Sequence, residues 1–383
     1  MPMPMIRTSL TREGCAGRQK RLCEHLSMSG LDAAVITDHR EIYYFTGALL
    51  PSWPACLMVM ADSRSWLAAQ TSDESPLTDN YLTYQPHTFY TNNPDNQRLL
   101  GQLVSRHLAG ASKLRRIGWQ AESTPHLIAN HLINAFSPDE WIALDDTLEK
   151  MERRKDADEV DLIRRSIRAD LAGYDAAQAA IRPGVNELEV LAAAQRAAML
   201  DAGEGVYHGG DFRAAAMGGV ARDRRVESGE LFIVDAQTVF RGYWCDLART
   251  YSVGQTPTDL QQSIYAHIAA IQREVAGLLK PGLKGTALWR FLDGRIREHP
   301  ALAQSGLIHH AGHGVGLRAH EAPDLNRDRE GILEPGNIVS VEPGGYTDAA
   351  RFGARIENMY LITETGAETL SDYAMNLVPT ASD

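Results

Sequence analysis

Two similar acidic stretches stand far apart in this chain, and this internal repeat constrains the fold more than any other feature. In each stretch a glycine stands six positions before a carboxylate that ends an apolar run, and these two carboxylates are Asp235 and Glu342. A second carboxylate follows each of them, Asp246 or Glu357, on a segment typical of a strand returning from a turn. The repeat therefore predicts two matching hairpins, each with a pair of carboxylates.

Helical patterns precede both acidic stretches. Apolar periodicity predicts two helices before the first stretch, at 157–180 and 187–202, and two before the second, at 260–279 and 284–298. The turns that link the helices also match, since both contain a Pro-Gly step. A pseudo-twofold arrangement of two such units would bring both hairpins to one axis. The second part of the chain is thus predicted to be an α+β domain with its carboxylates gathered at that axis.

The first third of the chain has a different pattern, in which short apolar strands alternate with helices. Alternation of this kind indicates an α/β domain that ends near residue 145. The charge-dense segment 148–158 is interpreted as the junction, so the predicted domains are 1–147 and 148–383. The predicted elements of the first domain are helices at 18–29 and 97–108 and strands at 33–37, 55–61, 65–69 and 116–119.

A histidine cluster at 308–321 lies between the two acidic stretches, and the combination indicates a two-metal site. Two divalent ions need bridging anionic oxygens and open positions for a shared water. Carboxylates supply such oxygens, a neutral imidazole adds a terminal ligand, and this set suits Mn, Co, Fe or Zn better than Ca. Each carboxylate alone is more often a turn residue or a helix cap. As an alternative to metal binding, Arg249 and Arg355 could neutralise the buried carboxylates in a purely structural role.

The motifs around these residues resemble the creatinase, aminopeptidase P and prolidase family of pita-bread metallohydrolases. They are D-A-Q and G-Y-W-C-D-L-A-R-T in the first stretch, G-H-G-V-G-L-R-A-H-E-A-P in the histidine cluster, and V-E-P-G-G-Y and G-A-R-I-E-N in the second stretch. The segment 30–47 also resembles the first domain of that family. The resemblance therefore covers nearly the whole chain and implies an α/β N-terminal domain followed by a pita-bread catalytic domain.

The resemblance implies a set of metal ligands. Asp235 would bind one ion, and Asp246 would bridge both. His313 would bind the second ion with Glu342 beside it, and Glu357 would be the other bridge. Two divalent ions are expected, with manganese favoured and cobalt, zinc or iron as alternatives.

Three further residues match site residues of the family. His320 matches a histidine that contacts the substrate or the tetrahedral intermediate, and His309 matches a pocket histidine, although the adjacent His310 leaves that register open. Arg355 matches an arginine that hydrogen-bonds within the site. For each of the three, the alternative is an ordinary structural role, either in a capped loop or in a surface salt bridge.

The expected reaction is hydrolysis of a C–N bond. A metal-bridging hydroxide would attack a peptide or amide carbonyl, Glu342 would carry the proton to the leaving nitrogen, and His320 would stabilise the oxyanion. The resemblance points to peptides with proline in the second position. A non-peptide hydrolase or lyase, of creatinase-like or ectoine-hydrolase-like type, is the alternative. A non-catalytic binding protein is the third reading, which the complete ligand set disfavours.

Two departures from the family pattern fall in the predicted substrate pocket. Peptidase members carry a histidine on the segment before the first aspartate, but this chain has none between His208 and His267. His208 itself is a candidate replacement from a nearby loop. The family's D-x-G has become D-A-Q, which places Gln237 where a glycine allows a close turn. The sequence therefore predicts an intact metal centre with weak activity on ordinary Xaa-Pro dipeptides.

Composition limits the partners of the protein. The net charge of −11 argues against nucleic acid or an anionic membrane as the main partner. The first residues lack a signal-like apolar run and no long apolar stretch occurs, so a cytoplasmic protein is expected. The four cysteines show no C-x-x-C spacing that would indicate a zinc site. The resemblance also implies a homodimer, with 50–54 as a lid segment, and a monomeric mass in solution would contradict it.

Overall fold

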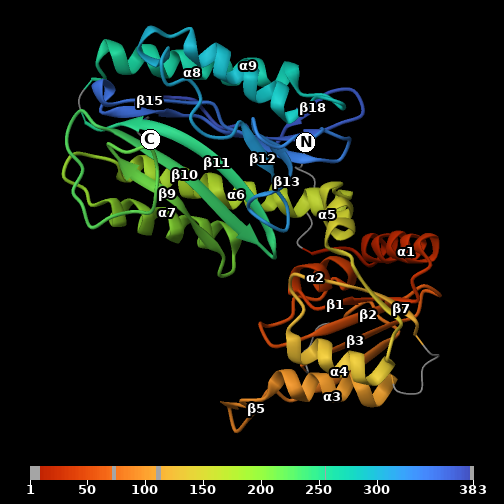
Figure 1. The fold of residues 1–383 in the computed structure, drawn as a ribbon. Helices are drawn as coiled ribbons and strands as arrows, with labels where there is room; N and C mark the ends of the chain where they lie inside the picture. The colour runs from red at the N-terminus through yellow and green to blue at the C-terminus, as the bar shows by residue number, and fades with distance from the viewer. Residues whose placement is uncertain (1–8, 71–74, 109–113, 255, 380–383) are drawn as a thin grey trace, which may run out of the picture. The chain divides into compact units, whose positions relative to one another are not determined.

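The computed structural model describes residues 9–70, 75–108, 114–254 and 256–379 of the chain. Two compact units divide the chain between Met151 and Glu152, within helix α5 (Asp145–Arg153). Figure 1 shows the helices and strands of both units. Among the helices in the described ranges, none is long and apolar enough to span a membrane.

The N-terminal unit is built on a six-stranded sheet with the order β4-β3-β2-β1-β7-β8. Its strands are β1 (Ala33–Ile36), β2 (Cys56–Met60), β3 (Ser65–Gln70), β4 (Asn80–Tyr84), β7 (Arg116–Trp119) and β8 (Glu140–Ala143), and a small ribbon joins β5 (His87–Thr88) to β6 (Thr91–Asn92). Its other helices are α1 (Arg12–Ser29), α2 (His39–Thr46), α3 (Asn96–Leu108) and α4 (His126–Phe136).

Helices cover both faces of this sheet (Figure 1). Leu100 and Val104 of α3 and Leu132 of α4 pack with Val35 and Met58 of the sheet in one apolar cluster. On β1 all four residues are buried, as expected for a strand with helices on both faces. The unit is therefore an α/β domain.

The second unit begins with a helix pair and a three-stranded sheet. The helices are α6 (Ala157–Ala180) and α7 (Glu187–Ala202), and the sheet has the order β11-β10-β9. Its strands are β9 (Tyr207–Ala214), β10 (Leu231–Phe240) and β11 (Tyr243–Ser252). Asp156 and Asn186 start the two helices in capping boxes. Arg241 and Gly242, both at positive φ, form the two-residue turn between β10 and β11.

A second helix pair and a second sheet follow. The helices are α8 (Asp259–Leu278) and α9 (Gly285–Arg297), and a capping box at Thr258 starts α8. The sheet has the order β13-β12-β14-β17-β18, beside a two-stranded ribbon of β15 and β16. These strands are β12 (Gly312–Gly314), β13 (Glu321–Leu325), β14 (Ile338–Val341), β15 (Gly344–Thr347), β16 (Phe352–Arg355), β17 (Asn358–Ile362) and β18 (Ala367–Thr369).

The helix pairs lie on the outside of the second unit, and the two sheets face each other between them (Figure 1). The predicted helices before each acidic stretch are confirmed to within a residue. The hairpin prediction is confirmed for the first stretch only. In the second stretch β14 pairs with β17 and β15 with β16, so the hairpin is interrupted on both arms.

Candidate metal centre

The first pair of carboxylates lies on one face of an uninterrupted strand pair. Asp235 and Gln237 are two positions apart on β10, so their side chains leave the same face. Asp246 of β11 stands directly opposite Gln237 in the register. Both carboxylates are buried, with residue exposures of 8% and 2%. Strand alternation alone therefore brings this pair together.

The second pair lies where the second hairpin is interrupted. Glu342 follows β14 directly, and Glu357 directly precedes β17. Both are buried, at 5% and 1% exposure. An isolated antiparallel bridge between Ala248 of β11 and Glu357 joins the two halves at this point. The interruption thus turns the second pair toward the first.

The four carboxylates and His313 form overlapping groups. Oxygens of Asp235, Asp246 and Glu357 lie within 4.8 Å of one another, and so do ligand atoms of His313, Glu342 and Glu357. His313 Nε2 is also 3.7 Å from Asp246 Oδ2. Because Glu357 belongs to both groups and Asp246 lies near His313, these two carboxylates occupy the middle of the cluster.

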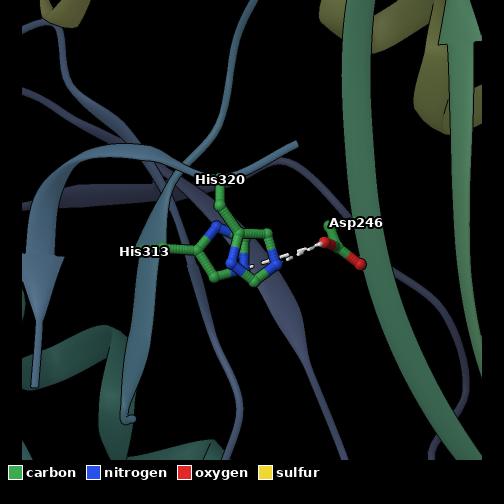
Figure 2. A group of neighbouring side chains, drawn as sticks. All are labelled: Asp246, His313 and His320. Atoms are coloured by element: carbon green, nitrogen blue, oxygen red, sulfur yellow. Dashed lines mark ion pairs between the residues drawn. The ribbon is translucent and has the colours of Figure 1, made fainter. Parts of the chain in front are cut away.

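Two histidine rings stack beside Asp246, as Figure 2 shows. The rings of His313 and His320 have centroids 3.6 Å apart and planes inclined by 13°. His320 Nε2 lies 3.9 Å from Asp246 Oδ2, and its side chain remains 55% exposed. The site therefore opens to solvent on the side of His320.

Burial and mutual repulsion shift the titration of every group in the cluster. Burial raises the pKa of Asp235 to about 6 and that of Glu342 to about 8, against the opposing effect of Arg355. Burial and the neighbouring carboxylates raise the pKa values of Asp246 and Glu357 well above the ordinary range. A bound cation would relieve this repulsion.

The donor set fits divalent ions. Asp246 Oδ1 is buried and has no hydrogen-bond partner within the described part of the chain, which leaves it available as a ligand. Burial lowers the pKa of His313 well below its ordinary value, so its ring is neutral at pH 7, as metal ligation requires. Two neutral donors restrain the carboxylates: Gln237 Nε2 donates to Asp246 Oδ2 at 2.7 Å, and the Ser340 hydroxyl donates to Glu357 Oε1 at 2.5 Å.

Arg355 connects the carboxylates at one edge of the site. Its guanidinium lies 2.7 Å from Asp235 Oδ2 and 3.7 Å from Glu342 Oε2, and it donates to Asp211 Oδ2 at 3.0 Å. Asp211 is a site residue that the sequence interpretation missed. Its place in the strand pairing reveals it, because Asp211 stands opposite Asp235 in the β9–β10 register and so shares its face.

His309 and His310 lie beside Glu342. Their Nδ1 atoms are 3.8 Å and 3.2 Å from oxygens of Glu342. His309 Nε2 also contacts the Tyr346 hydroxyl at 3.0 Å. Both histidines line a cavity of about 330 Å³ together with Trp289. Burial lowers the pKa of His309 to about 3 and that of His310 to about 4, so both rings are neutral at pH 7.

His208 lies on the opposite face of the first sheet. Its Nδ1 is 2.8 Å from the Thr238 hydroxyl and 3.2 Å from Asp170 of α6, and the side chains of His208 and Asp170 are fully buried. Thr238 is adjacent to Gln237 on β10, so alternation turns it away from the metal-ligand face. Cys245, adjacent to Asp246 and opposite Thr238 in the register, is directed to that same opposite face.

Family models match both parts of the chain. The model of metallopeptidase family M24 matches residues 161–364, and the creatinase/prolidase N-terminal domain matches residues 18–152. An uncharacterized peptidase of Bacillus subtilis is 30% identical over 273 residues, which cover 69% of this chain and 75% of that protein. An Xaa-Pro dipeptidase of Pyrococcus horikoshii is 25% identical over 363 residues, covering 94% and 98%.

Solved structures resemble the whole chain. A prolidase from Pyrococcus horikoshii OT3 has a TM-score of 0.80 at 23% identity and covers 94% of this chain and 99% of its own. An X-Pro aminopeptidase from Thermotoga maritima has a TM-score of 0.77 at 23% identity, with the same coverage. These likenesses confirm the predicted fold, an α/β N-terminal domain followed by an α+β catalytic domain.

Proposed function

Because this chain belongs to metallopeptidase family M24 and is a metallohydrolase, we propose that it hydrolyses Xaa-Pro peptides with two divalent ions, as an aminopeptidase P or a prolidase does. One observation carries the proposal: four buried carboxylates and a neutral imidazole form overlapping groups that share Glu357. Isolated buried carboxylates are costly unless they are paired or bind metal. A dinuclear site accounts for four of them at one point.

The proposed ligands are Asp235, Asp246, His313, Glu342 and Glu357, with Asp246 and Glu357 as bridges. The hard oxygens favour manganese, with cobalt, zinc or iron as alternatives. When bound, the two ions would lower the pKa of a shared water and polarise the scissile carbonyl. The chain's own side chains would then supply proton transfer and orientation.

Glu342 is proposed to carry the proton. It belongs to the carboxylate cluster and lies 3.2 Å from His310, which lines the cavity, so it would be within reach of both a bound water and a leaving nitrogen in that cavity. A general base needs this reach more than any particular pKa. His320 is proposed to donate to the developing oxyanion, since its neutral ring stands over His313 at the open side of the site.

His309 and Arg355 are proposed to bind the substrate. His309 lines the cavity next to Glu342, where the group on the leaving side of the scissile bond would lie. Arg355 orients Asp235 by a charge-assisted contact at 2.7 Å and limits the site on the other edge. The substrate would therefore lie between these two residues, having entered from the open side of the site near His320.

A second candidate function is hydrolysis or lysis of a non-peptide C–N bond on the same metal centre. The observation that favours it is the position of His208, which is held behind the first sheet by Asp170 and Thr238. Loss of one oxyanion donor costs about 2.7–4 kcal/mol, or roughly 10²–10³ in rate. Weak activity on ordinary Xaa-Pro dipeptides is the expected consequence.

The deciding experiment compares Xaa-Pro dipeptides, longer Xaa-Pro peptides and small amides with protein reconstituted with manganese. We expect turnover of Xaa-Pro peptides with kcat/KM below about 10⁴ M⁻¹s⁻¹. Turnover of small amides in the absence of any peptide cleavage would reject the peptidase proposal and support the second candidate. Asp246→Ala is the control for contaminating activity.

A further inference from the structure

A buried ion pair outside the proposed ligand set anchors the loop that carries His320. Lys155 Nζ contacts Glu321 Oε1 directly, and the two side chains are only 1% and 5% exposed. Lys155 belongs to the charge-dense segment 148–158, and Glu321 immediately follows His320. The segment that the sequence marks as a junction is thus in contact with the active centre of its own unit.

The loop is shaped around this pair. A Cβ atom at Gly316 would lie 2.7 Å from Lys155 Cε and 2.8 Å from Glu321 Oε1, closer than ordinary contacts allow. The loop backbone therefore packs directly on both charged side chains. Taking two charges out of water is unfavourable unless their geometry is well matched, so a purely structural role could be filled as well by apolar residues.

A second contact fastens the same loop to the same segment. Arg318 Nη1 donates to Glu152 Oε2 at 2.6 Å, and the Arg318 backbone N–H lies 3.3 Å from Glu321 Oε2. At its start the loop accepts a hydrogen bond from the Trp244 backbone N–H to the Gly316 carbonyl, at 2.8 Å. His320 lies between these anchors along the chain.

Among the described residues, the His320 ring makes ring contacts, including an edge-to-face contact with His310 at 5.5 Å between centroids, but no side-chain hydrogen bond. It stacks on His313, and its 3.9 Å separation from Asp246 Oδ2 is too long for a hydrogen bond. With the side chain 55% exposed, few packing contacts restrict its rotamers. The place of the imidazole therefore depends on where the loop backbone is held.

We propose that Lys155 is a positioning residue for His320, acting through its ion pair with Glu321. The pair holds the loop so that the imidazole stays over His313, at the point where the oxyanion forms. This inference rests on the proposed function for the role of His320. A misplacement of about 1 Å at a reacting group costs about 10² in rate.

The test is a double-mutant cycle on the manganese-loaded full chain. Lys155→Met is expected to lower kcat about tenfold to a hundredfold, with KM and metal content unchanged, and Lys155→Arg should restore part of the loss. In a His320→Ala background, Lys155→Met should change kcat by less than about twofold, because the residue that it positions is gone. Equal losses in both backgrounds would overturn the proposal.

Two variants keep the test interpretable. Lys155→Met with Glu321→Leu leaves no unpaired buried charge, so it covers the case in which the single variant does not fold. It should show the same loss of kcat as Lys155→Met. Arg164→Met removes an exposed ion pair with Glu368 in the same unit and should leave kcat unchanged.

A labelling experiment separates this inference from the proposed function. Diethylpyrocarbonate modifies exposed imidazoles, and mass spectrometry reports its rate at His320 without any turnover. Lys155→Met should change that rate several-fold, and Arg164→Met should not. If the wild-type protein cleaves no peptide, the proposed function fails while the labelling result still stands. An unchanged labelling rate at His320 in Lys155→Met would reject the positioning role.

Discussion

The two halves of the catalytic unit supply their carboxylates by different means. Asp235 and Asp246 lie on an unbroken strand pair, where a two-residue turn and strand alternation are sufficient to bring them together. Glu342 and Glu357 lie at the interruptions of the other hairpin, between Val341 paired with Asn358 and Gly344 paired with Arg355 in the register. The same repeat thus places a ligand pair by regular pairing in one half and by a break in pairing in the other.

The halves also differ in chemistry. Within the described residues, the imidazoles near the carboxylates all come from the second half, at His309, His310, His313 and His320. The first half contributes carboxylates and the amide of Gln237, because its only nearby histidine faces α6. The first half therefore supplies charge and one amide donor, and the second supplies charge together with the neutral imidazoles.

Removal of either bridging carboxylate should have the largest effect. Asp246→Ala in the first half and Glu357→Ala in the second should each lower the metal content from two ions per chain to less than one. The loss of metal removes several kcal/mol of transition-state stabilisation, or about 10³ or more in kcat/KM. Elemental analysis of the purified variants checks the content, and full occupancy in both would reject the bridging assignment.

A matched control comes from another acidic group among the described residues. Asp156, Asp158 and Glu159 also cluster, but they lie at the start of α6, where Asp156 forms a capping box. Asp156→Asn keeps a capping side chain, so it should retain two ions and full activity. Loss of metal in this variant would show that the assay reports folding rather than ligation.

The imbalance of imidazoles predicts opposite outcomes for two histidines. His309→Ala should lower kcat/KM about tenfold to a hundredfold with stability little changed, because its ring lines the cavity beside Glu342. His208→Ala should leave kcat/KM within about twofold but cost about 1–3 kcal/mol of stability, since buried Asp170 loses a partner. A large fall in kcat/KM for His208→Ala at full metal content would show that His208 acts in the substrate pocket.

Sequence reasoning could predict what depends on local pattern. The helices before each acidic stretch follow from apolar periodicity, and the alternation that groups Asp235 with Gln237 follows from strand geometry; both depend on neighbouring residues and are found in the structure. The interruption at Glu342 could not be predicted, because it depends on which distant strand pairs with each segment. Asp211 was missed for the same reason, since only the β9–β10 register shows its proximity to Asp235.

The hydrogen bonds that restrain the bridging carboxylates should differ in strength between the halves. Ser340→Ala removes a fully buried donor to Glu357, and Gln237→Ala removes a partly exposed donor to Asp246. Both should weaken metal binding by about tenfold to a hundredfold, with the buried Ser340 at the upper end. Chelator competition measures the affinity, and Ser263→Ala in α8 is the control. Unchanged affinity in Ser340→Ala would exclude a role for this bond.

The smallest expected effect is the pH dependence of the stability of the metal-free protein, which distinguishes the two halves. Folding raises the pKa of Asp235 to about 6 and that of Glu342 to about 8, and Arg355 lies nearer to Asp235. An acid with a raised pKa binds more protons when folded, so its contribution to stability is lost as pH rises through the folded value. Buried neutral histidines act in the opposite direction only below about pH 6.5, the ordinary histidine value.

Between pH 7 and 8 the decline should therefore report Glu342, together with Asp246 and Glu357, whose pKa values are also raised well above the ordinary range, and not Asp235. Each such proton corresponds to about 1.4 kcal/mol per pH unit, or roughly 3–6 °C in Tm for a domain of this size. Scanning calorimetry with chelator present should show this fall in the wild type and in Asp235→Asn, and a flatter profile in Glu342→Gln. Bound metal should abolish the decline, because it keeps the carboxylates ionised. A Tm that rises from pH 7 to 8 in the metal-free wild type would contradict the raised pKa of Glu342, and with it the weaker neutralisation of the second half.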